Sequence, residues 1–271
     1  MLGCGSRVHL RNVGLPIREA DIAEEKTMLN WLFVPIFSFV LAFPALAAEV
    51  NVLSGGAVEP GLVAAADAFR KETGNEVKIK FATAPAIRQR VSSGETFDVV
   101  VAPPAVLDEI VKSGKLDGKA RVPVGRVGIG VAVRDGAPKP DISTTDAFKR
   151  AVIDADSLVY NRASSGLIVE GLLQRLGLAE QTQAKTTRYA GSDMIEPLIK
   201  GNGKELGFSP VTEILLYRGK GLQLVGPLPA DIQNYTSYAA EPAFNSEAAL
   251  AFVHFLGTPA AKAIFVAAGI E

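Results

Sequence analysis

Four short segments, at positions 54–57, 83–86, 164–166 and 191–193, combine small residues with hydroxyl groups. In each of them a predicted strand gives way to a predicted helix. The first N–H groups of a helix have no acceptor within the helix and lie at the positive end of its dipole, so they attract anions. Small residues let a ligand come close to these groups. The four segments therefore predict a site that holds a small oxyanion with neutral donors.

The candidate ligand-binding residues are the members of these segments and the helix-starting positions beside them. They are Ser54, Gly55, Gly56, Ala57, Thr83, Ala84, Ser164, Ser165, Gly166, Ser192, Asp193 and Met194. A cleft built from this set would carry many backbone dipoles and few fixed charges. Each segment also has a simpler interpretation as a tight strand-to-helix connection with no ligand. If each of two facing domains supplies two segments, all four line one cleft.

Several side chains near these segments have two interpretations. Arg88 and Arg162 could add positive charge to the cleft, or they could be solvated surface arginines. Tyr189 and Tyr235 could cover a ligand, or they could pack at the rim or in the core. Two aspartates could bind a cation, although we expect them to cap helices, and these are Asp98 and Asp193.

Residues 28–47 have the pattern of a secretory signal. The run is apolar, lacks charged residues, follows Lys26 and ends in the small-x-small triplet Ala45-Leu46-Ala47. We expect cleavage after Ala47 and a mature protein in the periplasm. An uncleaved membrane anchor is the alternative, because about 20 apolar residues suffice to span a bilayer. The polar stretch before the run is long for a signal, so Met28 is a candidate start in place of Met1.

Removal of residues 1–47 excludes several kinds of catalytic site. It takes away the only cysteine and leaves His254 as the only histidine, so a thiol nucleophile and a Cys/His zinc site are impossible. No Walker A, GxGxxG or HExxH motif is present. We expect no cofactor, no metal and no enzymatic activity. The alternative class is a serine hydrolase using Ser54 or Ser164, but we expect its only partner, His254, to be packed in an apolar helix.

The composition is that of a globular protein with a balanced charge. The 271 residues are 48% hydrophobic, and 28 basic residues face 29 acidic ones, for a net charge of −1. This suffices for one large domain or two modest ones. Because no block of like charge is present, nucleic acid is not an expected partner.

The first half of the mature chain alternates strands and helices. Pro85 suits a first helical position, with Thr83 or Ala84 as its cap. Three strand–helix units in a row predict parallel strands with their strand-to-helix loops at one edge of the sheet. Alternation at 127–133 predicts a further strand that leaves this domain for a second one. The predicted strands lie at 50–53, 77–81 and 97–102, and the helices at 62–73, 85–91 and 105–113.

The second half repeats this alternation, with Thr144 or Thr145 as a helix cap and Gly177 as a helix stop. Pro197 weakens the helix predicted around it. Thr258-Pro259 opens the last helix. The helix after this cap carries Phe148, Ala151 and Val152. The predicted strands lie at 157–160, 185–190, 205–209, 222–225 and 235–238, and the further helices at 167–176, 194–200, 211–217, 246–256 and from 258 onward.

Several stretches of the sequence, together with the secretory signal, resemble the periplasmic molybdate-binding proteins. They are VNVLSGGA at 50–57, FRKETGNEV at 69–77, QRVSSGETFDVVVA at 89–102 and FLGTPAAKAIF at 255–265. The resemblance covers essentially all of residues 48–271. It implies an α/β fold of the two-lobed type 2 periplasmic-binding-protein kind, with two crossover strands as a hinge. Lobe 1 would comprise 48–125 and 236–271, and lobe 2 would comprise 126–235.

The chain departs from the family where the family supplies hydroxyl groups to the ligand. Ala57 and Ala84 stand where the family typically has serines, and Pro210 stands near its binding tyrosine. Backbone donors at positions resembling Ser165 and Met194 tolerate substitution. Three lost hydrogen bonds to a charged ligand, at about 1.5–3 kcal/mol each, would weaken binding by several decades. The residues close enough in sequence to compensate are Ser54, Thr83 and Ser209.

The resemblance also implies a function. We expect the substrate-binding component of an ABC importer, a monomer that closes on molybdate, tungstate or a related small anion and delivers it to a membrane permease. The alternative ligand is a small organic acid. A ligand-sensing partner of a membrane receptor would use the same cleft.

Overall fold

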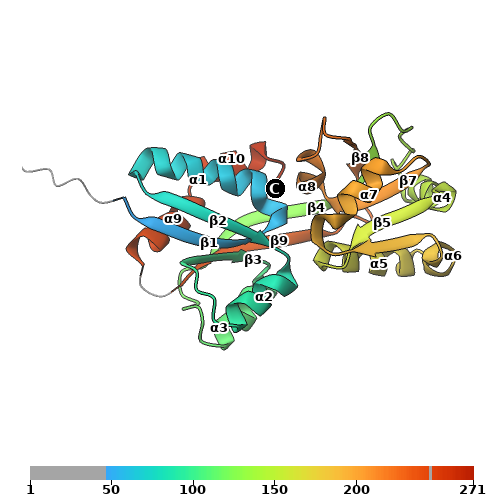
Figure 1. The fold of residues 1–271 in the computed structure, drawn as a ribbon. Coiled ribbons are helices and arrows are strands. Elements are labelled where there is room, and N and C mark those ends of the chain that lie inside the picture. Colours follow the sequence, from blue (N-terminus) through green and yellow to red (C-terminus); the bar gives the residue numbers. More distant parts are fainter. Residues whose placement is uncertain (1–46, 244–245) are drawn as a thin grey trace, which may run out of the picture. The chain divides into compact units, whose positions relative to one another are not determined.

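The computed structural model describes residues 47–243 and 246–271, and Figure 1 shows their fold. The predicted secretory signal lies outside the described residues except for its last position, Ala47. In the described part of the chain, no single helix is both long and apolar enough to cross a membrane.

The first three strands form the parallel sheet that the sequence predicts. β1 (Glu49–Gly55) pairs with β2 (Glu76–Ala82) on one side and with β3 (Val99–Ala102) on the other. Helices α1 (Glu59–Thr73), α2 (Ala84–Ser92) and α3 (Pro104–Lys112) connect and follow these strands. Side chains of β1 pack into one core with α1 and into another with α2 and α3, so both faces of the sheet are covered.

The residues at the N-termini of α1 and α2 explain where these helices begin. Thr83 caps α2, since its side-chain oxygen accepts a hydrogen bond from the N–H of Ala86, and Pro85 stands in the first turn. A short 3₁₀ turn, η1 (Gly56–Val58), precedes α1, so α1 begins at Glu59 and not at Leu62 as predicted. Within segment 54–57, Ser54 and Gly55 therefore end β1, while Gly56 and Ala57 already belong to η1.

Two long antiparallel strands connect the two halves of the molecule. β4 (Val122–Arg134) pairs with β9 (Tyr235–Pro242) along its first half. From Ile129 onward β4 instead pairs with β7 (Glu205–Pro210) and β8 (Leu222–Pro227). β9 in turn pairs with β3, so one continuous sheet runs through both halves. The prediction that the strand at 127–133 leaves the first domain for a second is confirmed.

The second half has its own parallel strands and its own core. β5 (Ser157–Asn161) lies between β6 (Thr186–Tyr189) and β7. The helices of this half are α4 (Thr145–Asp154), α5 (Ser164–Arg175), α6 (Ala179–Gln183), α7 (Ile195–Lys200) and α8 (Val211–Leu215), with the 3₁₀ turn η2 (Gly191–Met194) before α7. α6 was not predicted. Pro197 is tolerated because it is the third residue of α7, where an N–H would have no intrahelical acceptor.

The last two helices return to the first half. α9 (Glu247–Leu256) and α10 (Pro259–Ala267) pack with α1 over β1, β3 and β9. We call the part built from β1–β3, β9, α1–α3, α9 and α10 lobe 1, and the part built from β5–β8 and α4–α8 lobe 2. The cores of lobe 1 and lobe 2 contain different residues. The exact boundaries at 125/126 and 235/236 stay a prediction.

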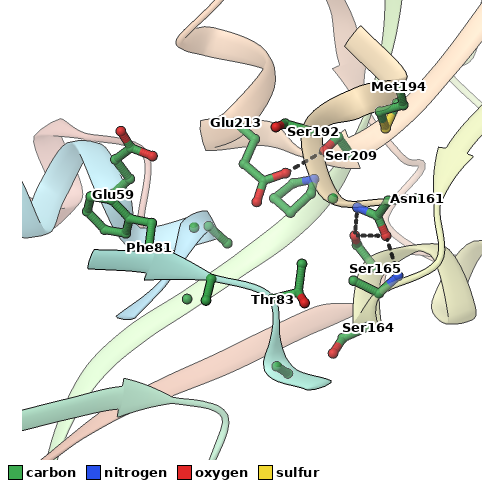
Figure 2. A pocket seen from close by; sticks show the side chains of 18 of the residues that line it. Glu59, Phe81, Thr83, Asn161, Ser164, Ser165, Ser192, Met194, Ser209 and Glu213 are labelled. Atoms are coloured by element: carbon green, nitrogen blue, oxygen red, sulfur yellow. Dashed lines mark hydrogen bonds between the residues drawn. The ribbon is translucent and has the colours of Figure 1, made fainter. Parts of the chain in front are cut away.

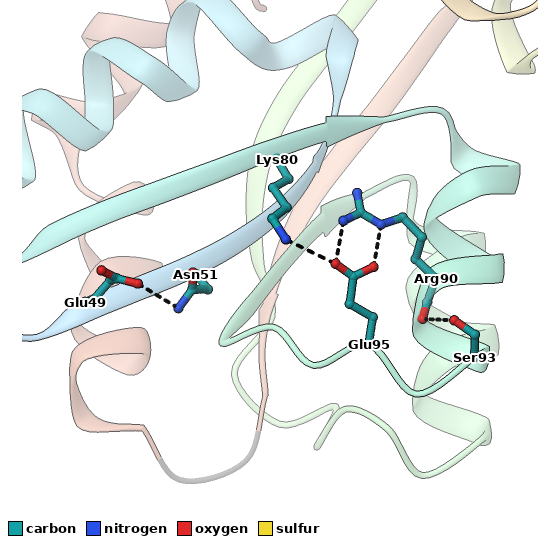
Figure 3. A network of polar contacts seen from close by, with 6 residues as sticks. All are labelled: Glu49, Asn51, Lys80, Arg90, Ser93 and Glu95. Atoms are coloured by element: carbon teal, nitrogen blue, oxygen red, sulfur yellow. Dashed lines mark hydrogen bonds and ion pairs between the residues drawn. The ribbon is translucent and has the colours of Figure 1, made fainter.

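A polar network on lobe 1 fixes the connection between α2 and β3. The guanidinium of Arg90 donates two hydrogen bonds to Glu95, from Nε at 2.6 Å and from Nη2 at 2.5 Å, and Lys80 bonds the same carboxylate at 3.2 Å (Figure 3). Arg90 also lies 5.2 Å from the ring centre of Phe97. The hydrogen bonds from Arg90 and Lys80, together with the positive charges of both side chains, lower the pKa of Glu95 to about 2.

Candidate functional site

A pocket of about 350 Å³ lies where the strand-to-helix connections of the two lobes meet. Figure 2 shows its side chains. Lobe 1 contributes Gly55, Gly56, Ala57, Glu59, Phe81, Ala82, Thr83, Ala84, Pro103 and Tyr238, and lobe 2 contributes Asn161, Ala163, Ser164, Ser165, Gly191, Ser192, Met194, Ile195, Ser209, Pro210, Glu213, Leu216 and Tyr217. All four segments that the sequence singled out therefore contribute to one pocket.

The first wall is the end of β1. Gly55 lies against the ring of Tyr238 from the crossover strand β9: a Cβ at Gly55 would come within 2.8 Å of Tyr238 Cε1. Only glycine lets that ring lie so close to the chain. Gly56 and Ala57 follow in the η1 turn, and their N–H groups are at its start. The turn thus presents backbone donors beside an aromatic ring.

The second wall is the start of α5, which begins at Ser164 and not at Leu167 as predicted. The side chain of Asn161 organises it, because its Oδ1 accepts hydrogen bonds from the N–H groups of Ala163 at 2.9 Å and Gly166 at 3.1 Å. Its Nδ2 donates to Ser165 Oγ at 2.9 Å. The Gly166 amide is thereby used, while the amides of Ser164 and Ser165 have no intrahelical acceptor.

Gly166 is required by this arrangement although it does not line the pocket. A Cβ there would come within 1.6 Å of the carbonyl oxygen of Asn161. The third residue of α5 must therefore be glycine for Asn161 to reach the helix start.

Glu213, on α8, is the carboxylate that faces this pocket from lobe 2. Its Oε2 accepts a hydrogen bond from Ser209 Oγ at 2.7 Å (Figure 2). Its Oε1 lies 3.2 Å from the position that a Cβ of Gly56 would occupy, so it lies next to the η1 turn of lobe 1. Burial raises the pKa of Glu213 above its ordinary value, the Ser209 hydrogen bond lowers it, and the negative charge of Glu59 raises it.

Tyr238 lies close enough to Glu213 to respond to its charge. Burial raises the pKa of the Tyr238 phenol, and the negative charge of Glu213 raises it further. Tyr238 lines the pocket, and its phenol stays protonated to a higher pH than that of an ordinary tyrosine.

Some of the predicted ligand-binding residues do not line the pocket. Ser54 is fully buried and its hydroxyl donates to the carbonyl of Gly55 at 3.1 Å. Asp193 is exposed, and its N–H donates to Ala190 within η2. Gly166 is occupied as described. The other predicted residues line it: Gly55, Gly56, Ala57, Thr83, Ala84, Ser164, Ser165, Ser192 and Met194.

The charged and aromatic side chains that the sequence suggested lie elsewhere. Arg88 bonds Glu109 on α3, and Tyr235 lies under the guanidinium of Arg126 at 4.2 Å. Among the described residues, the pocket lining contains no lysine or arginine, so Arg162 is absent from it, as is Tyr189.

Other single-residue predictions are settled by the surroundings of each side chain. Asp98 does not cap a helix: its Oδ2 accepts the N–H of Asn51 at 2.7 Å and ties β3 to β1. The prediction of a packed His254 is wrong, because α9 buries Phe252, Val253 and Phe255 and turns position 254 outward. Ser54 is fully buried, so it is not accessible as the nucleophile of the alternative serine hydrolase.

The positions that depart from the resembled family all line the pocket. Ala57 and Ala84 offer no hydroxyl there, and Pro210 offers neither a hydroxyl nor an N–H. The hydroxyls that do line it come from Thr83, Ser164, Ser165, Ser192, Ser209 and the two tyrosines Tyr217 and Tyr238.

Sequence reasoning missed Asn161, Glu213 and Tyr238. Asn161 ends a predicted strand and starts a predicted turn, which is a recognisable position for a side chain that accepts helix N–H groups. Glu213 gave no comparable signal, because a single glutamate on a short helix is ordinarily solvated. Tyr238 reaches the pocket only because β9 crosses between the lobes.

Comparison with known proteins places the fold and the family. The model of the bacterial extracellular solute-binding proteins matches residues 50–271. Among solved structures, the periplasmic molybdate-binding protein of Azotobacter vinelandii is 18% identical with a TM-score of 0.67, covering 82% of this chain and 99% of that one. The sulfate-binding protein SubI of Mycobacterium tuberculosis is 19% identical with a TM-score of 0.66, covering 82% and 86%.

A curated relative corrects one expectation. The aconitate isomerase of a Pseudomonas species is 35% identical over 237 residues, which are 82% of this chain and 88% of the relative. The expectation that this chain has no enzymatic activity is contradicted, because this relative is named as an enzyme. The predicted two-lobed type 2 binding-protein fold is confirmed. The chain belongs to the bacterial extracellular solute-binding protein family.

Proposed function

We propose that the protein binds a small polycarboxylate in the pocket between its lobes and isomerises it by moving a proton between two carbon atoms, as an aconitate isomerase would. The observation that carries the proposal is Glu213, a carboxylate whose pKa burial raises, lining a pocket that is otherwise built from neutral donors. The 35% identity to an aconitate isomerase supports the choice of substrate.

The chemistry requires one base and several hydrogen-bond donors. Aconitate is a propene that carries a carboxylate on each of its three carbons. Removal of a proton from its CH₂ group leaves an allylic anion whose charge spreads onto the carboxylates. Return of a proton to the opposite end of the allyl unit moves the double bond. The product is again aconitate, and its new double bond can be cis or trans. One proton leaves and one arrives, so no oxidant, reductant or second reactant is needed.

Glu213 is suited to the base role. A carboxylate of ordinary pKa is too weak a base to remove a proton from carbon efficiently near neutral pH, and burial strengthens it. Ser209 occupies Oε2, which leaves Oε1 as the atom that takes the proton and returns it. Both terminal carbons of the planar allyl unit can be reached from the same face, so one carboxylate can remove the proton from one carbon and return it to the other.

The neutral donors are suited to the charge that develops. The amides at the start of α5 and in the η1 turn, with the hydroxyls of Thr83, Ser164 and Ser192, would bind the substrate carboxylates. As the proton leaves carbon, negative charge moves onto those carboxylates, and fixed donors then stabilise it more strongly than they stabilise the ground state. The Tyr238 phenol, whose pKa burial raises, would add one further donor.

The same features make a metal oxyanion a poorer fit. Ala57, Ala84 and Pro210, which stand where the resembled family supplies hydroxyls, offer no hydroxyl to an oxyanion. A volume of about 350 Å³ also exceeds what a tetrahedral oxyanion fills. These observations move our preferred ligand from molybdate to an organic acid. The periplasmic location, cleavage after Ala47, a monomeric state and an importer partner stay predictions.

The test is turnover of cis-aconitate and trans-aconitate by the purified protein, followed by proton NMR in D₂O. We expect interconversion of the isomers with deuterium entering at carbon. Glu213→Gln should lower kcat by about a thousandfold or more while the variant still binds the substrate, because an amide cannot accept the proton. Binding of aconitate without turnover would leave a solute-binding protein. Binding of molybdate or tungstate in preference to aconitate would overturn the proposed ligand class.

A further inference from the structure

The short helix that carries Glu213 contacts both lobes. On one side, Ile214 belongs to the core of lobe 2 and lies against Gly130 of β4, where a Cβ would come within 3.1 Å of Ile214 Cδ1. On the other side, Thr212 faces the turn after α10, where a Cβ at Gly269 would lie 3.8 Å from Thr212 Cγ2. α8 is therefore the part of lobe 2 that rests on lobe 1.

Among the described residues, one hydrogen bond joins α8 to the η1 turn of lobe 1. The Thr212 hydroxyl donates to the carbonyl oxygen of Ala57 at 2.5 Å, between residues that are 155 positions apart in the chain. Both residues are buried, with Thr212 fully so. The neighbouring residue, Glu213, places Oε1 over Gly56 in the same loop. The hydroxyl thus fixes the distance between the carboxylate and the backbone donors of η1.

We propose that Thr212 is a positioning residue for the proton transfer, and this inference rests on the proposed function. Thr212 does not line the pocket, so it acts through Glu213. By tying α8 to Ala57, it holds Oε1 in line with the amides that bind a substrate carboxylate. A substrate whose carboxylate is bound at η1 then has the CH₂ group that Glu213 deprotonates at a fixed distance from the base.

The experiment is Thr212→Val, which keeps the β-branched shape and removes only the donor. We expect kcat for aconitate to fall by about tenfold to a hundredfold with KM within about threefold of wild type, since a displacement of about 1 Å can cost a hundredfold in rate. Thr212→Ser should restore most of kcat. In the Glu213→Gln background, Thr212→Val should lower the residual rate no further.

The matched control is Thr182→Val. Thr182 is also buried, and its hydroxyl donates to the carbonyl of Leu178 at 2.8 Å, far from the pocket lining. It reports the loss of a buried hydroxyl–carbonyl bond with no positioning role, and we expect an unchanged kcat. Hydrogen exchange without ligand should accelerate in 55–59 and 211–215 in Thr212→Val but not in Thr182→Val.

The outcomes separate this inference from the proposed function. If wild type shows no turnover, the proposed function fails, and the exchange measurement alone decides whether Thr212 joins the two segments. If wild type turns over and Thr212→Val has the kcat of Thr182→Val, the positioning role is overturned. A rise in KM with an unchanged kcat would also overturn it, because it would place Thr212 in substrate binding.

Discussion

Ser209 and Glu213 lie four positions apart in the chain, and the Ser209 hydroxyl donates a 2.7 Å hydrogen bond to Oε2 of Glu213. Ser209 is buried at the end of β7, and Glu213 follows in α8. The bond stabilises the charged form of a carboxylate that burial disfavours. The pH dependence of the protein follows from this opposition.

Ser209→Ala should move the acidic limb of kcat/KM to higher pH. The Ser209 hydrogen bond lowers the pKa of Glu213, so its removal raises that pKa further. Because a base must be deprotonated, activity would be lost at a higher pH as the medium is acidified. The pH profiles of wild type and variant for aconitate turnover measure the shift. Ser113→Ala, which removes a hydroxyl on α3 from a bond to Ile110, should leave the limb in place.

Glu213→Gln should stabilise the protein at high pH. A raised pKa in the folded state means that Glu213 contributes stability while it is protonated, below its unfolded-state pKa, and that this contribution is lost as pH rises through the folded-state pKa. The neutral amide carries no such loss. The Tm of the variant should exceed that of wild type at pH 8, and the difference should shrink toward pH 4. A lower Tm for the variant at pH 8 would contradict the assignment of a buried charge.

Tyr238→Phe should lower kcat with little change in stability. The ring that lies against Gly55 is retained, and only the phenol hydroxyl of this pocket-lining residue is lost. Loss of one fixed donor to a developing negative charge lowers kcat by up to about a hundredfold. Steady-state kinetics with aconitate would measure the loss. Tyr160→Phe, which removes a phenol buried in the core of lobe 2, is the control, and equal rates for the two variants would contradict a donor role.

Arg121→Met should destabilise lobe 1 strongly. Arg121 Nε bonds Oε2 of Glu241 at 2.7 Å, and Glu241 is fully buried on the crossover strand β9. Its Oε1 has no partner among the described residues. An uncompensated buried charge costs about 3–5 kcal/mol. Urea unfolding would measure the loss, and adding Glu241→Gln should recover part of it. Asp108→Asn, which removes the exposed partner of Arg121, should cost under about 1 kcal/mol.

Arg90→Ala should weaken the acid sensitivity of the protein. The pKa of Glu95 is lowered to about 2, chiefly by Arg90, from 4.5. Glu95 therefore contributes stability above pH 4.5, and this contribution is lost as pH falls toward about 2. The fall of Tm between those pH values should be shallower in the variant. An equally steep fall would show that other carboxylates govern acid unfolding.

Most of the fold could be predicted because local chemistry agrees with the final structure. Thr83, Thr144, Ser246 and Thr258 each cap the helix that follows them, and the apolar runs of β1 and β3 sit between two helical layers. Helix starts at Glu59 and Ser164 were placed too late, because small residues and glycines resemble turns. The η1 turn also makes a contact with a residue much later in the chain, the hydrogen bond from Thr212 to the carbonyl of Ala57.

The site could be predicted in its backbone but not in its chemistry. Strand-to-helix connections at one sheet edge can be recognised in the sequence by their glycine, serine and threonine residues. Glu213 cannot, since its surroundings include the η1 turn and the negative charge of Glu59, which lie far earlier in the chain. A carboxylate acquires an unusual pKa only in three dimensions. The expectation that the chain has no enzymatic activity is contradicted by its 35% identity to a relative named aconitate isomerase.

The pocket has an optical consequence. In a chain that begins at Ala48, no tryptophan remains, so emission near 300 nm would come from the tyrosines alone. Two of them, Tyr217 and Tyr238, line the pocket. Binding of a non-fluorescent, negatively charged ligand beside those rings should therefore change the intrinsic fluorescence. Ligand binding to the unlabelled protein could then be titrated by its tyrosine emission.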